Sequence, residues 1–142
     1  MLSYKLWVAR ICVALVVFLL FIASSYALWW YGILRIHTFL KHWELFGISV
    51  LLQVIAGVLL GLSPEVFFNL RNVRFSPIKF IVLAIIPLII LVYIVGYFGG
   101  YWSPDPYLLS LFISSYITTE FGLTTSSVWL GVAIGKAFHI RQ

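Results

Sequence analysis

Charged side chains, and acids above all, are scarce in this sequence. Charged residues make up 9% of the 142 positions, and the acidic ones are Glu44, Glu65, Asp105 and Glu120. About a quarter of the residues of an average soluble domain are charged. The polar residues that are present form no nucleophile with a base, no pair of carboxylates and no glycine-rich phosphate loop. We therefore expect a protein that is not an enzyme and binds no cofactor.

Cysteine is almost absent as well. The single cysteine, Cys12, cannot form a disulfide or a cysteine-based metal site within the chain. Among other candidate ligands, His37, His42 and Glu44 fall in or beside one connection, whereas His139 lies near the opposite end of the predicted fold. A metal site needs three or four ligands in a fixed geometry. We predict no metal site.

Apolar residues dominate what is present. They make up 63% of the chain, and the mean hydropathy is +1.12. A helix of about 20 residues crosses a bilayer core of about 30 Å, and the apolar residues fall into blocks of that length or more. The sequence predicts an all-α membrane protein, a single domain over residues 1–142 built as a bundle of four transmembrane helices. The predicted spans cover residues 11–31, 43–62, 78–98 and 107–138. The last is longer than a bilayer needs, so we expect it to tilt, project or break.

Three Ser-Pro pairs mark the connections, at Ser63-Pro64, Ser76-Pro77 and Ser103-Pro104. A serine hydroxyl accepts a hydrogen bond from a free backbone amide at the start of a helix, and proline suits the first helical position. Each pair therefore predicts a helix start. The first pair predicts a short interfacial helix over residues 64–72, between spans two and three.

Basic residues are concentrated on one side of the predicted membrane. With four spans, the side of both termini carries Lys5, Arg10, Arg71, Arg74, Lys79, Lys136 and Arg141, and the other side carries Arg35 and Lys41. By the positive-inside rule both termini lie in the cytoplasm, and we expect the cell membrane as the location. Arg71, Arg74 and Lys79 are expected to contact lipid headgroups. We read the charge as a topology signal and expect no nucleic-acid partner.

Glu120 is the one acid near the middle of an apolar block. An ionisable group there costs at least about 2.5 kcal/mol and usually faces protein or a water-filled cavity. Helical spacing puts Tyr116 and Thr124 on the same face, and Gln53, mid-way along span two, is positioned to reach across to the fourth span. Two interpretations stay open. These residues form a site for a proton or a cationic substrate, or Glu120 is a protonated helix-packing or loop residue and Gln53 joins helices.

Small residues recur every four positions, which lets helix backbones approach closely. We predict helix-packing interfaces at Gly57, Gly61, Ser127, Gly131 and Gly135. A second stripe on the fourth block indicates contacts on two sides; it consists of Ser110, Ser114, Thr118, Gly122 and Ser126. A contact with a partner chain or within a homo-oligomer explains the second stripe of small residues. A compact bundle in which the fourth helix is buried explains it equally.

These features favour a small non-catalytic subunit or accessory component of a larger membrane protein complex, docked through the small-residue faces of spans two and four. The alternative is a small transporter, channel or membrane substrate-binding component that uses Glu120 for a proton or a cationic substrate. No convincing internal repeat is evident, because a Ser-Pro pair followed by an acid is all that the two halves are seen to share.

Overall fold

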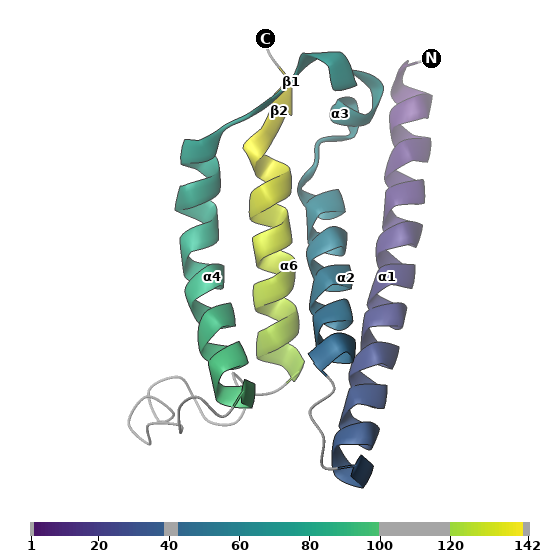
Figure 1. Cartoon of the computed structure of the whole chain (residues 1–142). Helices are drawn as coiled ribbons and strands as arrows, with labels where there is room; N and C mark the ends of the chain where they lie inside the picture. The colour runs from purple at the N-terminus through teal and green to yellow at the C-terminus, as the bar shows by residue number, and fades with distance from the viewer. Residues whose placement is uncertain (1, 39–42, 100–119, 141–142) are drawn as a thin grey trace.

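Helices make up nearly all of the computed structural model, which describes residues 2–38, 43–99 and 120–140 (Figure 1). The long helices are α1 (Leu2–Thr38), α2 (Trp43–Gly61), α4 (Pro77–Gly99) and α6 (Glu120–Ala137). The connection from α2 to α4 contains a short helix α3 (Pro64–Phe68), a 3-10 turn (Leu70–Asn72) and strand β1 (Val73–Phe75). Strand β2 (Phe138–Ile140) follows α6 directly.

Three of the described helices are long and apolar enough to cross a membrane: α1 over Tyr4–Leu34, α2 over Trp43–Gly61 and α4 over Pro77–Val95. They coincide with the first three predicted spans, although α1 is longer than its predicted span at both ends. Its 37 residues measure about 55 Å at a rise of about 1.5 Å per residue. α6 lies within the fourth predicted block and begins at Glu120, and residues 107–119 of that block lie outside the described residues.

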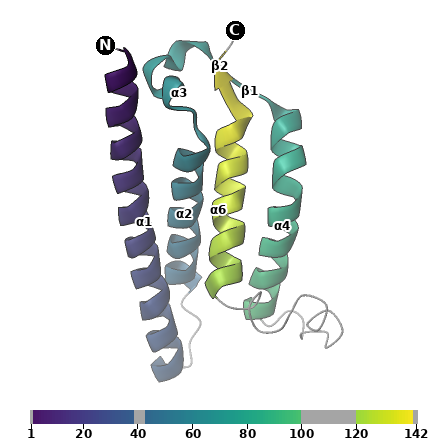
Figure 2. The ribbon, with the colours of Figure 1, turned by 180° about the vertical axis from the view of Figure 1, so that it is seen from behind.

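The four long helices stand side by side in one row, in the order α1, α2, α6, α4 (Figures 1 and 2). α1 and α4 run in one direction, and α2 and α6 run in the other (Figure 1). The two central helices are therefore parallel, and each has an antiparallel neighbour on its outer side. α6 packs against both α2 and α4. Its small residues predict contacts on two sides, and these two helices of the same chain supply them.

Glycine backbones are in direct contact where α2 and α6 pack, along a line that we call the seam and define by Gly57, Gly61, Gly131 and Gly135. A Cβ atom added to Gly131 would lie 2.8 Å from the Cα of Gly57, and one added to Gly135 would lie 2.9 Å from the Cα of Gly61. Cβ atoms essentially never approach other atoms within 3.0 Å. Only glycine fits these positions, because any larger residue would push the two helices apart.

The seam is built from a short internal repeat. Residues 54–61 and 128–135 share the pattern V-x-x-G-V-x-x-G. The packing is reciprocal: Gly57 faces the carbonyl oxygen of Val128, and Gly131 faces the carbonyl oxygen of Val54. At this contact, residues 54–61 and 128–135 are therefore related by an approximate two-fold axis that runs between α2 and α6, parallel to the helices. The expectation of no internal repeat is therefore wrong for these eight residues.

The connection between α2 and α4 differs from the predicted single interfacial helix over residues 64–72. α3 ends at Phe68, and β1 pairs antiparallel with β2, with Arg74 opposite His139. The ring of Phe75 packs against those of Phe80 and Phe138, at centroid distances of 5.8 and 5.2 Å. The amide of Ser76 also donates to the carbonyl oxygen of Ala137 at 2.9 Å. These contacts end α6 one residue earlier than predicted and make the fold not entirely α-helical.

Two of the three predicted helix starts are confirmed. α3 begins at Pro64 and α4 begins at Pro77, whereas Ser103-Pro104 lies outside the described residues. The serine side chains cap these helix starts less than expected. The Ser63 side chain makes no capping hydrogen bond, and the Ser76 hydroxyl accepts from the amide of Lys79 only at 3.5 Å. Proline at the first helical position is the feature common to both starts.

The close contact at the seam predicts unequal effects for two glycines of α2. Gly57→Ala forces a Cβ into the backbone of α6 and should lower the free energy of unfolding by about 1–3 kcal/mol, the usual cost of overpacking. Gly47→Ala is the matched control, because its Cβ meets nothing within 4 Å, and alanine favours a helix by up to about 1 kcal/mol over glycine. Reversible unfolding in mixed micelles, followed by circular dichroism, measures both. Equal effects of the two substitutions would contradict the close packing.

Candidate functional site

Four buried or half-buried polar side chains from three helices meet next to the seam, and we call them the polar cluster: Ser24 of α1, Ser49 and Gln53 of α2, and Thr124 of α6. Gln53 joins all three helices. Its Nε2 donates to the Ser24 Oγ at 2.8 Å and to the Thr124 Oγ1 at 3.1 Å. The predicted position of Gln53, within reach of the fourth block, agrees with this bond to α6.

Ser24 and Ser49 bind α1 to α2 in a reciprocal way. Their hydroxyl oxygens lie 2.8 Å apart. The Ser24 hydroxyl also reaches the Ser49 carbonyl oxygen at 3.3 Å, and the Ser49 hydroxyl reaches the Ser24 carbonyl oxygen at 3.2 Å. Both residues are almost completely buried. Small side chains that bond across to backbone carbonyls bring two helices close together, as is typical of membrane helix interfaces.

Two buried polar atoms near the seam have no hydrogen-bond partner: the Oε1 of Gln53 and the Oγ of Ser127. Exchanging the oxygen and nitrogen of the Gln53 amide would not help, because one end of the amide would still face no partner. Ser127 is fully buried on α6, one turn before Gly131. A buried polar group without a partner costs about 1–3 kcal/mol.

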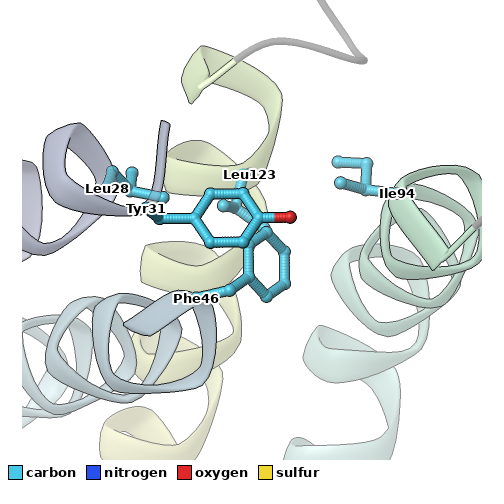
Figure 3. Packing of buried hydrophobic residues seen from close by; sticks show 5 residues of the cluster. All are labelled: Leu28, Tyr31, Phe46, Ile94 and Leu123. Atoms are coloured by element: carbon cyan, nitrogen blue, oxygen red, sulfur yellow. The ribbon is translucent and has the colours of Figure 1, made fainter. Parts of the chain in front are cut away.

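Below the polar cluster, an apolar cluster fills the end of the row where α2 and α6 begin. Leu28 and Tyr31 of α1, Phe46 of α2, Leu123 of α6 and Ile94 of α4 form it (Figure 3). The rings of Tyr31 and Phe46 pack at a centroid distance of 5.7 Å. The Tyr31 hydroxyl points toward Ile94 and has no hydrogen-bond partner (Figure 3). This cluster joins all four long helices and so holds the outer helices to the central pair.

The predicted Glu120 site is seen only in part. Glu120 is the first described residue of α6. Residues 107–119 of the predicted span lie outside the described residues, so its depth within that span stays a prediction. Thr124 stands one turn further along α6 and bonds Gln53. Tyr116 and the side chain of Glu120 lie outside the described part of the structure. Residues 120–127 are helical, so the chain is not unwound over these eight residues.

Ser24 is a site residue that the sequence alone does not reveal. It lies inside the first apolar block, beside Ser25, and nothing in that block distinguishes the two serines. In the structure Ser24 is 1% exposed, whereas Ser25 is exposed. The signal that separates them is the rotation of α1 about its axis, which places one serine toward α2 and the other away from it.

The glycines predicted as packing surfaces face one another inside the chain. Gly57 and Gly61 are covered by Gly131 and Gly135, and Ser127 is fully buried beside them. The expectation that these faces receive a partner chain is therefore wrong for these five residues, because their surfaces are already occupied. Any partner must contact other surfaces of the molecule.

Most of the basic residues gather at one end of the row, which we call the charged end. The start of α1, the end of α6, α3 and both strands lie there (Figure 1). Arg71, Arg74 and Lys79, the predicted headgroup contacts, are all exposed at this end. So are Phe68 and Leu70, at 58% and 71% exposure. Exposed arginines beside exposed apolar side chains are typical of a segment that lies at a membrane surface.

Among the described residues, no group of three or more histidine, cysteine or acidic side chains is placed to hold a metal ion. No family model, curated protein or solved structure matches this chain.

The polar cluster predicts different effects for two adjacent serines. Ser24→Ala removes one of the acceptors of the Gln53 amide and the bonds of the Ser24 hydroxyl to Ser49. Interhelical hydrogen bonds in membranes average about 0.6 kcal/mol each, so we expect a loss of about 1–2 kcal/mol in the free energy of unfolding. Ser25→Ala is the matched control, because Ser25 is exposed, and it should change little. If both variants unfold like the unmodified protein, the cluster does not stabilise the contact of α1 with α2.

Proposed function

We propose that this chain is a non-catalytic subunit or assembly component of a larger membrane protein complex. The observation that carries the proposal is the arrangement of the four long helices in a single row (Figures 1 and 2). Among the described elements, such a row leaves each outer helix with one long helix as its neighbour. In the apolar window of α1 only 6% of the residues are buried, compared with 33% in α2.

The length of α1 supports the same conclusion. A helix of about 55 Å exceeds a bilayer core of about 30 Å, so α1 projects beyond the membrane at one end or both. Most helical stability in proteins comes from tertiary packing of a helix face. A projecting helix end with no neighbour in the described chain gains from a partner that packs against it.

The exposed aromatic residues of α1 indicate where a partner would bind. Three exposed aromatic residues lie within one helical turn of α1: Tyr26, Trp29 and Trp30. Their rings contact one another, with centroids 5.5–6.3 Å apart. Aromatic side chains are enriched in protein interfaces, where they bury a large area at low entropic cost. We therefore propose that the partner packs on this face of α1 rather than on the glycine faces of α2 and α6.

We further propose that all four long helices cross the cell membrane, with the charged end in the cytoplasm. α6 packs beside α2 in register along the seam, and this packing supports the proposal that α6 crosses together with α2. Six exposed Lys and Arg residues lie at the charged end and satisfy the positive-inside rule: Lys5, Arg10, Arg71, Arg74, Lys79 and Lys136. A reporter fused to the carboxy terminus that is active only in the cytoplasm tests this orientation.

The unpaired polar atoms at the seam favour a second candidate function, a small transporter, channel or substrate-binding component. Transporters built from repeats place substrate sites near the middle of the membrane, at the interface between the repeats. Gln53 and Ser127 lie at such an interface. In this alternative, Glu120 carries a proton or contacts a cationic substrate, and Glu120→Gln would abolish transport or binding without affecting expression.

A photo-crosslinking experiment in the native membrane tests the first proposal. Benzoylphenylalanine in place of Tyr26, which is 60% exposed on α1, should form adducts with one or a few partner chains. The matched control is Ile85, which is 52% exposed on α4 and should form adducts with lipid. Mild extraction into nanodiscs and mass spectrometry identify the products. A protein recovered alone, with lipid adducts at both positions, would contradict the subunit proposal, and a retained small molecule would favour the second candidate.

A further inference from the structure

The antiparallel pair of β1 and β2, which we call the ribbon, has two chemically different faces. Successive side chains of a strand point to opposite faces, and residues directly opposite each other on two strands share one face. On one face of the ribbon the rings of Phe75 and Phe138 are in contact, at a centroid distance of 5.2 Å. The other face carries Arg74 and His139, which are directly opposite each other. The ribbon is therefore apolar on one face and basic on the other.

The basic face brings together two side chains that suit an anion. The Cβ atoms of directly opposite residues lie about 4.5–5.5 Å apart, so Arg74 and His139 extend from neighbouring points. Arg74 is exposed and His139 is half-buried. The Nδ1 of His139 lies 3.4 Å from the carbonyl oxygen of Ala137, which leaves Nε2 to face a ligand. An arginine binds a phosphate through two parallel hydrogen bonds, and a protonated ring nitrogen adds a third.

Exposed apolar side chains indicate that this face lies at the level of lipid headgroups. Leu70 and Ile78 lie four residues before and after Arg74, and they are 71% and 73% exposed. Such side chains at the end of a membrane helix bundle are stabilised at the boundary between acyl chains and headgroups. β1 leads into α4, and β2 follows α6 directly. A phospholipid therefore presents its phosphate at this level, which favours a lipid over an anion dissolved in water.

The charges around the ribbon favour a lipid with a net negative charge. Six exposed Lys and Arg residues lie at the charged end, and Glu65 is the one acid among the described residues there. A zwitterionic headgroup carries a cation next to its phosphate, and the basic residues repel that cation. An anionic headgroup has no such cation.

We propose that Arg74 and His139 bind the phosphate of one anionic phospholipid, with Leu70 and Ile78 against its acyl chains. This site narrows the headgroup contact that the sequence predicts for Arg71, Arg74 and Lys79, and it adds His139 to it. The proposal does not depend on the role as a complex subunit, so either can fail without the other.

The chain offers a selective test, because its histidines are His37, His42 and His139. Protein labelled with 15N in its histidine rings is placed in liposomes that contain phosphatidylglycerol and phosphatidylcholine in equal amounts. Dephasing of the 15N signals by 31P, measured by solid-state NMR, reports which ring lies next to a phosphate. His139→Asn identifies the signal of His139. We expect dephasing of the His139 ring in the mixed liposomes and none in phosphatidylcholine alone.

Two arginine variants test whether the phosphate is bound by the pair. Arg74→Gln should abolish the dephasing of His139, because loss of one arginine near the membrane surface lowers the affinity for an anionic lipid by roughly five-fold and this arginine contacts the phosphate. Arg10→Gln is the matched control, because it removes an exposed arginine of the charged end that lies on α1. It should leave the dephasing in place.

Four results would overturn the proposal. The first is a His139 ring without dephasing in the mixed liposomes. The second is equal dephasing in phosphatidylcholine alone, which would mean no preference for an anionic lipid. The third is dephasing that inorganic phosphate restores in phosphatidylcholine, which would make a dissolved anion the ligand. The fourth is dephasing that survives Arg74→Gln, which would mean that Arg74 does not hold the phosphate.

Discussion

The contact between glycine backbones of α2 and α6 is the constraint on which the rest of the fold depends. Gly57 faces the Val128 carbonyl oxygen and Gly131 faces the Val54 carbonyl oxygen, so backbone packs directly on backbone at this point, with no side chain between the helices. The contact fixes two helices in parallel. α4 carries the chain back from the end of α2 to the start of α6, so it runs antiparallel to both. α1 precedes α2 and also runs antiparallel to it. The start of α1 and the end of α6 therefore lie at one end (Figure 1).

Close backbone packing at the glycines also explains the composition of α6. A helix between two neighbours needs small side chains where its backbone meets α2, and it shows lipid less apolar surface than the outer helices do. α6 accordingly contains Thr124, Ser126 and Ser127, whereas the described helices that are long and apolar enough to cross a membrane are α1, α2 and α4. The same polar residues give α6 its bond to Gln53 and the unpaired hydroxyl of Ser127.

Much of the fold is predictable from the sequence, and the reasons are local. Apolar blocks locate α1, α2 and α4, and Pro64 and Pro77 mark two helix starts, because hydropathy and proline geometry act within a few residues. The partners of a side chain depend instead on how each helix is rotated and which helices are neighbours. The bonds of Ser24, the pairing of β1 with β2 and the mutual burial of Gly57 and Gly131 all belong to this second class. The repeat is not evident from the sequence alone, because it pairs residues 74 positions apart and consists of only valine and glycine spacing.

The parallel packing of α2 and α6 is tested most directly by distances between spin labels in liposomes. With Cys12 replaced by serine, one label replaces Lys136 at the end of α6, and the second replaces either Leu60 or Glu44, near opposite ends of α2; all three positions are exposed. Because Gly61 lies level with Gly135, the pair at 60 and 136 should be close. The pair at 44 and 136 should be farther apart by roughly 20–25 Å, from the rise of about 1.5 Å per residue. The reverse order of the two distances would mean antiparallel helices and would contradict the seam.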